Sequence, residues 1–491
     1  MTSLLPSTRL LIGGKLVEGA DGVFATVNPA TEAVIGHAAN ADAADMDAAI
    51  TAARAAFDDT DWSREHAFRA HCLEQLRTAL GAHLEDLRAL TIAEAGAPAM
   101  LTRGPQLDGP VADLAYSAEL AQTYCWETDL GVAQPMGIKT RRVLRREPVG
   151  VVGAITPWNF PHQITFAKLG PALAAGNTVV LKPAPDTPGC AAAVGAIIAE
   201  ETDIPAGVVN IVTSSDHGLG AQLTEDPRVD LISFTGSTQT GRAVMRSAAT
   251  TLKKAFLELG GKSAFIVLDD ANIAAACGVA AFSVCVHAGQ GCAITTRLLV
   301  SRSGYDEAVQ AAAATLAGIR PGDPTDPRTV CGPLISARQR ARVERYLEIA
   351  RSEGGRIVVG GGRPAHLERG FFVEPTLIAG VSNSATVARE EIFGPVLVVI
   401  PYDGDEDAIR LANDSPYGLS GSVWGTDPER IRRVTNGVRT GTLSVNGGVW
   451  YSADAPFGGY KQSGIGREMG VAGFEEYLET KLIATAGQEE H

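Results

Sequence analysis

The stretch "VGVVGAITPWNFPHQITFAKLGPALAAGNTVVLKPA", residues 149–184, decides the fold of this chain. Residues 149–158 form a short apolar run that ends in turn residues, and residues 166–176 have a helical composition. A β-branched segment follows at 177–184 and ends near Lys182. A strand, a helix and a second strand in this order predict two parallel strands joined by a right-handed crossover.

The same alternation continues beyond this stretch. A helix is predicted over 187–201, with Thr187 as its N-cap and Pro188 at the first helical position. Because ligands bind beyond the carboxyl ends of parallel strands, we expect a binding site where the strands of this series end. The remaining segments of the series are strands at 207–214, 229–237 and 254–261 and helices at 216–225 and 238–250.

A second series of alternating segments runs from about Lys262 to about residue 470. An Ala-rich helix with acidic residues in its first turns is predicted near the start of the chain, over 40–59. Together the two series predict an α/β protein built on parallel sheets. The segments of the second series include strands at 263–268, 296–301, 395–402 and 420–425 and helices at 305–318 and 336–354.

Composition narrows the range of partners. The chain has 491 residues, which suffices for about three domain-sized units, and its formal net charge is -14. An acidic surface argues against nucleic acid or an anionic membrane as the main partner. No run of about 18 apolar residues predicts a membrane span, and residues 1–20 lack a basic region followed by a sustained apolar stretch, so we expect no secretory signal.

The seven cysteines are odd in number and scattered, and no CxxC pair occurs. Free thiols in a reducing, cytoplasmic setting fit this pattern best. The nine histidines form no HExxH or similar ligand pattern, so we expect no metal.

Two stretches resemble nucleotide-binding motifs without matching them. "GGKS" at 260–263 is similar to the end of a P-loop, but the upstream glycine that the motif requires falls at Phe256. The GxGxxG fingerprint is also missing. Instead, "FTGSTQTGR" places Gly236, Ser237 and Gly241 between a strand and a helix. This turn fits a pyrophosphate site at a helix N-terminus, and it fits an ordinary strand-to-helix turn equally well.

Two further motifs carry polar side chains on stiff turns. "PWNFP", 157–161, holds the Asn159 amide on a turn between two prolines, where it could donate to a developing oxyanion or simply form an Asx turn. "LELGGK" puts Glu258 at the end of an apolar strand beside glycines. That carboxylate could be a general base with a raised pKa, or a cap or ion-pair residue.

A cysteine among small residues completes the set. In "HAGQGCAITT", 287–296, Cys292 follows Gly289 and Gly291, so other molecules have room to approach its thiol, although a buried cysteine is more often a small hydrophobe. "EEIFGPV" at 390–396 and "APFGGYKQSGIGRE" at 455–468 add a carboxylate near a Gly-Pro turn and a glycine-rich loop with Phe457. Each of these motifs is weak by itself.

In this order, the motifs resemble the aldehyde dehydrogenase superfamily over nearly the whole chain, including "NPATEAVIG" at 28–36. The resemblance implies that Cys292 is the nucleophile, that Asn159 and the Cys292 backbone N–H form the oxyanion hole, and that Glu258 is the general base. It implies that Lys168 and Glu468 form a polar network behind Glu258. The implied cofactor contacts are Thr156, Trp158, Lys182, Phe234, Gly236, Ser237, Leu259, Glu391 and Phe393.

The implied reaction oxidises an aldehyde to a carboxylic acid with reduction of NAD(P). A thiolate adds to the aldehyde, and the resulting alkoxide expels hydride to the nicotinamide. This requires a lowered pKa at Cys292 or a nearby base. Water activated by Glu258 then hydrolyses the thioester. Two alternatives remain: an acylating enzyme that uses coenzyme A, which Glu258 disfavours, and a non-catalytic binding protein, which the complete catalytic set disfavours.

The chain departs from the family pattern at several positions. Pro185 in "KPAPDTP" stands where many relatives carry a carboxylate that excludes a 2′-phosphate, so we expect NAD with NADP use left open. His287 stands where relatives often carry Asn; it either packs or tunes the thiolate. An aromatic entry for an apolar aldehyde, and equally core or interface packing, is indicated by His162, Trp450, Tyr451 and Phe457.

The resemblance also implies three structural units and a homodimer or homotetramer. A Rossmann-type cofactor domain is expected at 1–125 and 148–259, and an α/β catalytic domain at 260–472. A small β-flap is expected at 126–147 and 473–491, and flaps of this kind pair between subunits by strand addition.

Overall fold

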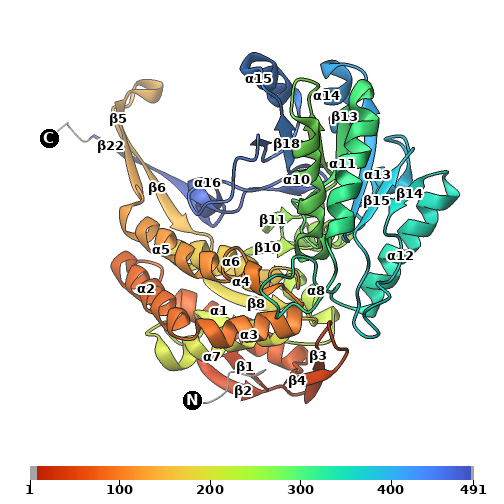
Figure 1. Cartoon of the computed structure of the whole chain (residues 1–491). Helices are drawn as coiled ribbons and strands as arrows, with labels where there is room; N and C mark the ends of the chain where they lie inside the picture. Colours follow the sequence, from red (N-terminus) through yellow and green to blue (C-terminus); the bar gives the residue numbers. More distant parts are fainter. Residues whose placement is uncertain (1–7, 488–491) are drawn as a thin grey trace.

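The computed structural model describes residues 8–487. It contains two large sheets, which lie in different parts of the molecule (Figure 1). Among these residues, no helix is both long and apolar enough to cross a membrane. The ends of the first and third predicted units, residues 1–7 and 488–491, lie outside the described part of the chain.

The first sheet has the strand order β2-β1-β9-β8-β7-β10-β11-β21, and β7 to β11 run parallel. This arrangement confirms the parallel sheet expected from residues 149–261. On one side β1 pairs antiparallel with β9 and with the edge strand β2, and on the other side the edge strand β21 pairs antiparallel with β11. The strands are β1 Arg9–Ile12, β2 Lys15–Glu18, β7 Val151–Thr156, β8 Thr178–Pro183, β9 Val209–Ile211, β10 Leu231–Thr235, β11 Lys254–Glu258 and β21 Gly464–Ile465.

Helices cover both faces of this sheet, and successive strand residues alternate between two hydrophobic clusters. Val152 and Ala154 pack against the helices α2, α3, α5, α6 and α7, whereas Val151 packs in the cluster that contains residues of α1, α8 and α9. The helices are α1 Ala43–Asp59, α2 His66–Ala82, α3 Leu84–Ala95, α4 Ala99–Thr102, α5 Asp108–Thr123, α6 Pro161–Ala175, α7 Pro188–Glu201, α8 Gly218–Glu225 and α9 Thr238–Ala248.

The helix α7 starts where it was predicted, with Thr187 at the N-cap position and Pro188 as its first residue, but the Thr187 side chain makes no capping hydrogen bond. Instead, the buried carboxylate of Glu94 on α3 accepts hydrogen bonds from the backbone N–H groups of Gly189 (3.0 Å) and Cys190 (2.9 Å). A side chain 95 residues away in sequence therefore caps the helix, which no local pattern could have indicated.

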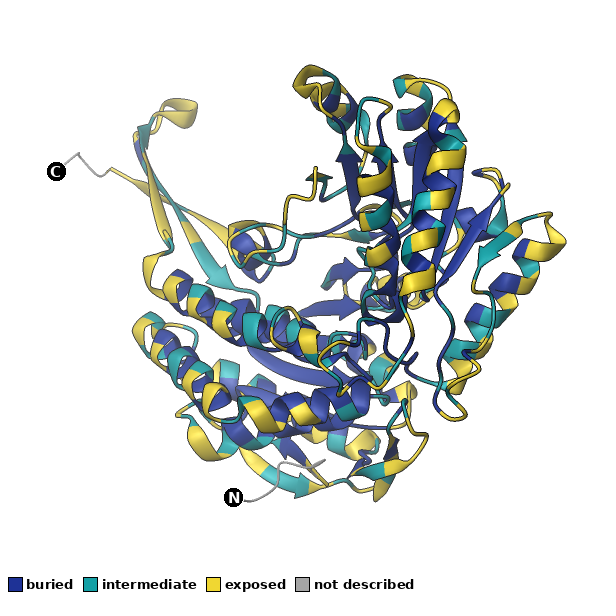
Figure 2. Ribbon diagram, viewed as in Figure 1, coloured by how far each residue is buried: buried dark blue, intermediate teal, exposed yellow. Residues whose placement is uncertain are grey.

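The second sheet has the order β14-β15-β16-β13-β12-β18-β19, and only β14 is antiparallel to its neighbour. Its strands are buried and are flanked by helices, as the dark strands in Figure 2 show. The elements are β12 Ser263–Val267, β13 Thr295–Ser301, β14 Arg356–Val359, β15 Thr376–Ala379, β16 Val396–Tyr402, β18 Gly421–Trp424, β19 Ser444–Val445, α10 Ile273–Cys285, α11 Tyr305–Gly318, α12 Ala337–Ser352, α13 Thr386–Arg389, α14 Asp405–Asn413 and α15 Pro428–Gly437.

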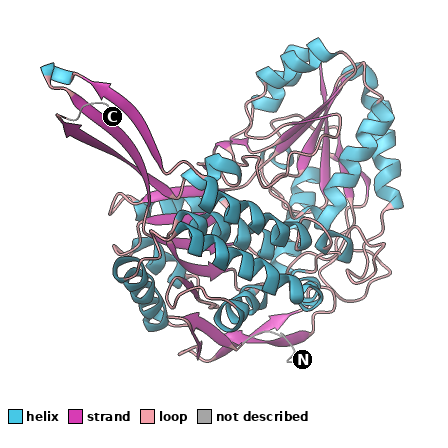
Figure 3. Ribbon diagram, turned by 90° about the vertical axis from the view of Figure 1, so that its left-hand side faces the viewer, coloured by secondary structure: helices cyan, strands magenta, loops and turns pink. Residues whose placement is uncertain are grey.

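A third sheet, of order β22-β6-β5, projects from the body as a long arm (Figure 3). It comprises β5 Glu127–Ala133, β6 Thr140–Pro148 and β22 Leu478–Ala486. These strands fall largely within the segments predicted to form the flap. The remaining strands form two two-stranded antiparallel sheets. These pair β3 Val23–Val27 with β4 Val34–Ala39, and β17 Tyr417–Gly418 with β20 Tyr460–Lys461.

The C-terminal part of the chain returns to the first sheet. β21 pairs with β11, and α16 Gly470–Glu475 packs against α6, with Phe474 in the core of the first unit. Residues 464–475 therefore pack on the first sheet, although they follow the second sheet along the chain. This segment spans the boundary that was expected at residue 472.

Candidate active site

A cavity of about 760 Å³, including its open mouth, lies where strands of the first sheet end and the second sheet begins. The loop after β7, the loop after β10 and the end of β11 all reach it. This is the edge at which parallel strands present their carboxyl ends. Nine predicted site residues line it: Trp158, Asn159, Gly236, Ser237, Glu258, Leu259, Cys292, Glu391 and Phe393.

The loop that leads to Cys292 has an unusual backbone. His287, Ala288 and Gly289 have φ angles of 49°, 51° and 73°, a left-handed run that is costly for residues with a Cβ. A Cβ on Gly289 would lie 2.1 Å from the carbonyl oxygen of Gly394, so only glycine permits this contact. The close approach places the Cys292 loop directly against the loop that carries Glu391 and Phe393.

The Cys292 thiol is partly accessible from the cavity. Burial is the main cause that raises its pKa, and the carboxylates of Glu258, Glu391 and Glu468 raise it further. The expected alternatives were a lowered pKa or a nearby base. Burial and the neighbouring carboxylates act against a lowered pKa, which favours the nearby base, and Glu258 lies in the same cavity.

Asn159 is held by hydrogen bonds at both its backbone and its side chain. Its side-chain Nδ2 donates to the carbonyl oxygen of Gln290 at 2.9 Å, and its own carbonyl accepts a bond from Gln106 Nε2 at 2.8 Å. The amide has two N–H groups, so one remains to donate into the cavity. The backbone N–H of Cys292 makes no hydrogen bond within residues 8–487. Each of the two predicted oxyanion donors therefore has one N–H group without a hydrogen-bond acceptor among the described residues.

Glu258 is buried at the end of β11, and neither of its carboxyl oxygens has a hydrogen-bond partner among the described residues. Burial raises its pKa well above the usual range, and Glu468 raises it further, whereas Lys168 lowers it. A buried carboxyl group without partners, aimed at a cavity that contains a thiol, is the environment of a general base.

Lys168 and Glu468 form a buried ion pair, with Nζ 3.2 Å from Oε1. Lys168 also donates to Ser233 Oγ at 3.0 Å and lies over the ring of Phe256. Neither residue lines the cavity, and neither bonds to Glu258, so they act on Glu258 through their charges.

The loop 391–393 is fixed by side chains that the motifs did not indicate. Gln339 on α12 donates to the carbonyl of Phe393 at 2.7 Å, and Arg342 donates to that of Glu391 at 2.5 Å. Phe393 has a left-handed φ of 61°, and its ring meets Trp158 edge-on at 5.4 Å. Gln339 and Arg342 also line the cavity. Their helix is polar on most of its surface, so no periodicity marked them.

Three predicted cofactor residues lie outside the lining of this cavity: Thr156, Lys182 and Phe234. All three stand at or near the carboxyl ends of neighbouring strands β7, β8 and β10. Burial lowers the pKa of Lys182 to about 8, and its amine faces Asp216. Asp186, next to Pro185, is not beside Lys182 but faces Arg338 and His217, and burial raises its pKa.

The expected aromatic entry does not form part of the cavity with Cys292. His162 is 1% exposed, stacks on Phe166 at 5.8 Å and has no hydrogen-bond partner among residues 8–487, so its predicted place facing a substrate tunnel is wrong. Burial lowers its pKa to about 4. The physical reason is that His162 lies in the first turn of α6 on a buried face.

The other three aromatic residues cluster beside the cavity. Trp450 stacks on Phe457 at 5.2 Å and meets Tyr451 edge-on at 6.3 Å. Phe457 pairs with Glu468 through two backbone hydrogen bonds. Their contact with substrate remains a prediction.

His287 is fully buried, with its ring edge-on to Phe160 at 5.5 Å. Neither ring nitrogen has a hydrogen-bond partner among the described residues, and burial lowers its pKa to about 4. A neutral, buried ring at this position favours the packing role over an effect on the thiolate. Across residues 8–487, no group of His, Cys, Asp or Glu side chains could hold a metal ion.

This combination of fold and site defines an oxidoreductase of the aldehyde dehydrogenase class. The family model described as "Aldehyde dehydrogenase family" matches residues 16–483. The chain belongs to the aldehyde dehydrogenase family, and the predicted fold and enzyme class are confirmed.

Individual relatives are similar along their whole length. A 3-succinoylsemialdehyde-pyridine dehydrogenase from Pseudomonas sp is 42% identical over 93% of this chain and 94% of its own. A betaine aldehyde dehydrogenase from Bacillus subtilis is 38% identical over 97% of both chains. The crystal structure of a Mycobacterium tuberculosis aldehyde dehydrogenase complexed with NAD+ superposes with a TM-score of 0.93 at 43% identity, covering 97% of each chain.

Proposed function

We propose that this protein oxidises an aldehyde to the corresponding carboxylic acid through a covalent intermediate on Cys292, with NAD as the electron acceptor. One observation carries the proposal: Cys292, Asn159 and Glu258, each more than 30 residues apart in sequence, line one cavity at the carboxyl ends of the parallel strands. Nucleophile, oxyanion donor and base in one place are the requirements of acyl chemistry on a thiol.

The residues around the cavity fit a nicotinamide dinucleotide. At the start of α9, the Thr240 N–H bonds to the Ser237 hydroxyl, and the N–H groups of Thr238 and Gln239 are available for a pyrophosphate. A Cβ on Gly236 would lie 2.5 Å from Phe234, so the turn admits only glycine without rearrangement. Glu391 uses one oxygen to accept from the Gly261 N–H at 2.8 Å, which leaves its other oxygen for a ribose hydroxyl. When bound, the nicotinamide accepts the hydride that leaves the aldehyde carbon.

Lys182, with its buried amine, would bind the adenosine ribose, and Thr156, Trp158, Ser237, Leu259 and Phe393 would complete the cleft. A carboxylate that would repel a 2′-phosphate is missing at Pro185, and Asp186 faces Arg338 and His217. We therefore propose NAD as the preferred cofactor, with NADP accepted at lower efficiency.

The first chemical step forms a C–S bond between Cys292 and the aldehyde carbon, while the thiol proton passes to a base. The Cys292 thiol is protonated at neutral pH in its present surroundings, because burial and three carboxylates oppose the thiolate. Glu258, itself with a raised pKa, can take that proton. The free N–H of Asn159 and the backbone N–H of Cys292 then stabilise the alkoxide, each donor being worth about 3–4 kcal/mol.

After hydride departs, Cys292 carries a thioester. Glu258 first releases to solvent the proton it took from the thiol and is ionised again. It then removes a proton from water while the water oxygen bonds to the acyl carbon, the C–S bond breaks, and that proton passes to the departing sulfur, which returns the thiol and releases the carboxylic acid. Lys168 and Glu468 adjust the proton affinity of Glu258 through their charges. We propose that this is the role of their ion pair, which lies one shell behind the reacting groups.

The rest of the proposal concerns architecture. We assign residues 1–125 and 148–259 to cofactor binding, 260–472 to the catalytic domain and 126–147 with 473–491 to an oligomerisation flap, with residues 464–475 packed back on the first unit. The projecting arm of β5, β6 and β22 supports a homodimer or homotetramer through its edge strands (Figure 3). Unpaired cysteines throughout residues 8–487 support a cytoplasmic setting.

The proposal is tested by rapid mixing of enzyme, NAD and an aldehyde panel, with the absorbance of the reduced cofactor as readout. The parent enzyme should give a burst of about one equivalent followed by steady turnover if deacylation is slow. Cys292→Ala should give neither, whereas Cys285→Ala, which removes a buried thiol of α10, should behave as the parent. Undiminished oxidation by Cys292→Ala would contradict the proposal.

Glu258→Gln separates the two halves of the reaction. Steady turnover should fall by about 10²–10⁴-fold in this variant. A burst of reduced cofactor that survives would show that another group can take the thiol proton and that Glu258 is required only for the hydrolysis. Loss of the burst together with turnover would assign Glu258 to the step before hydride transfer.

A further inference from the structure

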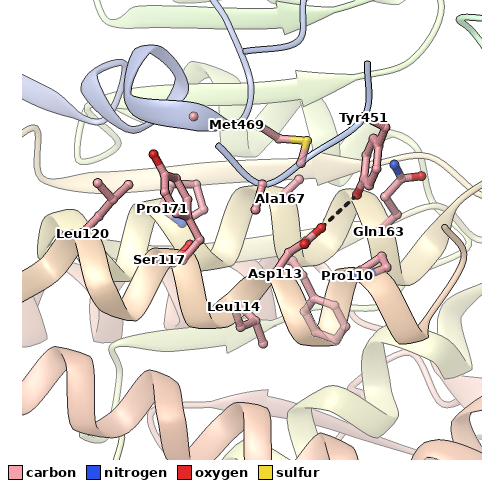
Figure 4. Close-up of a pocket in the computed structure, with 14 residues that line it drawn as sticks. Pro110, Asp113, Leu114, Ser117, Leu120, Gln163, Ala167, Pro171, Tyr451 and Met469 are labelled. Carbon is pink, nitrogen blue, oxygen red and sulfur yellow. Dashed lines mark hydrogen bonds between the residues drawn. The ribbon is translucent and has the colours of Figure 1, made fainter. Parts of the chain in front are cut away.

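A second depression, of about 440 Å³ including open space, lies between α5, α6 and the C-terminal part of the chain (Figure 4). Residues of α5 and α6 form its floor, and the segments 451–453 and 469–470 form its rim. The side chains of Asp113 and Tyr451 point toward each other across it, and the Tyr451 hydroxyl donates to Asp113 Oδ2 at 3.4 Å.

The walls of this depression are acidic and aromatic. Of the fourteen residues that line it, Asp113 is the one with a charge, and none is Lys, Arg or His. Tyr116, Phe166 and Tyr451 supply aromatic rings, and Trp450 lies beside Tyr451 at 6.3 Å. Aromatic faces and a carboxylate are the groups that attract an organic cation.

Asp113 is half-buried and forms no ion pair with any other described residue. Its one hydrogen-bond donor, Tyr451, is long at 3.4 Å and neutral. Burial raises the pKa of Asp113, and the Tyr451 hydrogen bond lowers it by a smaller amount. Buried charges are normally paired. The Asp113 carboxylate has no such pair among residues 8–487 and borders an open depression, in which a cation could bind.

The depression is next to the cavity that contains Cys292. Ile164 lines the first cavity and Ala167 the second, and residues three apart on a helix are surface neighbours about 5–6 Å apart. On the opposite rim, Met469 follows Glu468, whose charge reaches both Tyr451 and Glu258. A molecule several carbons long could therefore place one end at each site.

We propose that this depression holds the far end of the substrate and that Asp113 selects aldehydes with a cationic group, a protonated amine or a quaternary ammonium, at that end. The inference rests on the proposed function and deepens it, because it assigns a substrate class to the same site. An anionic end group would face Asp113 without any compensating cation in the walls. A purely apolar chain would leave the carboxylate buried and unpaired, which is costly.

The test compares two aldehydes of the same shape: 4-(trimethylammonio)butanal, which is charged at every pH, and the neutral 5,5-dimethylhexanal. The parent enzyme should show a kcat/KM at least about tenfold higher for the cation. Asp113→Asn should reduce this ratio about tenfold, mainly through KM of the cation. Asp113→Glu, which restores the charge, should recover part of it.

Two controls make the result specific. Glu119→Gln removes an exposed carboxylate from the same helix without touching the lining, so it should leave the ratio unchanged. The burst with the neutral aldehyde reports the folding and chemistry of every variant.

A parent ratio near one, or a ratio that Asp113→Asn does not change, would overturn the inference while the neutral aldehyde still shows that the enzyme oxidises aldehydes. Absence of reduced cofactor with any aldehyde would instead overturn the proposed function.

Discussion

Glu468 Oε1 lies 3.2 Å from Lys168 Nζ, and the charges of this buried ion pair shift the pKa of Glu258. Glu468 raises the pKa of Glu258 and Lys168 lowers it. The two residues are 300 positions apart in sequence, so their balance exists only in the folded chain.

Glu468→Gln should move the acidic limb of the deacylation pH profile to lower pH. Glu258 accepts a proton from water only when it is ionised, so turnover rises as pH passes upward through its pKa. Removal of the Glu468 charge leaves Lys168 uncompensated and lowers that pKa, so the limb shifts to lower pH. The pH dependence of kcat measures the shift. Glu475→Gln, at an exposed position on α16, serves as the control and should not move the limb.

Asn159→Ala should slow the burst phase by about 10²–10³-fold, because one of two oxyanion donors is lost. The amide also holds the Gln290 carbonyl at 2.9 Å, so a structural effect must be separated from a chemical one. Gln106→Leu removes the bond to the Asn159 backbone but keeps the donor amide, and should cost much less. Single-turnover rates that fall equally in both variants would assign Asn159 a positional role only.

Pro185→Glu should make the enzyme more selective for NAD over NADP. A carboxylate placed at this turn would repel a 2′-phosphate, so we expect kcat/KM with NADP to fall about tenfold or more while that with NAD stays within a few-fold. The measurement is the ratio of the two kcat/KM values before and after substitution. An unchanged ratio would show that Lys182 and its neighbour Asp216 set the preference instead.

Glu94 should make stability depend on pH between about 4 and 7. Burial raises its pKa to about 7 in the folded chain, whereas an unfolded Glu titrates near about 4.3. Its stabilising contribution is therefore fully present below the unfolded pKa and is lost as pH rises through the folded one, by about 1.4 kcal/mol for each unit of difference. Glu94→Gln should flatten the decline of Tm over this range. An equally steep decline in the variant would assign it to other groups.

The local patterns predicted most strands and helices of both sheets closely. The helix expected at 305–318 is α11, with the same bounds, because its alanines and apolar residues repeat at helical spacing. The start of α7 at Thr187 and Pro188 was also predicted, but the carboxylate that caps the helix comes from Glu94 on α3 and was not. Capping by a distant side chain leaves no trace in the sequence around the helix.

Some residues of the candidate site were likewise indicated by local motifs, and others were not. Cys292, Asn159 and Glu258 were predictable because each stands in a short motif beside glycines or prolines. Gln339 and Arg342 were not, since they contact the cavity from a helix whose sequence is polar on most sides. His162 was placed wrongly because an aromatic residue after a motif can face either the core or the site, and only packing decides which.

The sequence by itself determined the class of fold and the main candidate site residues, because strand and helix periods and motif residues are local properties of the chain. Tertiary structure alone decided the electrostatics: which carboxylates surround the Cys292 thiol, which lysine faces Glu468, and that Asp113 has no cationic partner among residues 8–487. The physical reason is that burial and charge–charge energies depend on distances between residues far apart in sequence, and folding sets those distances.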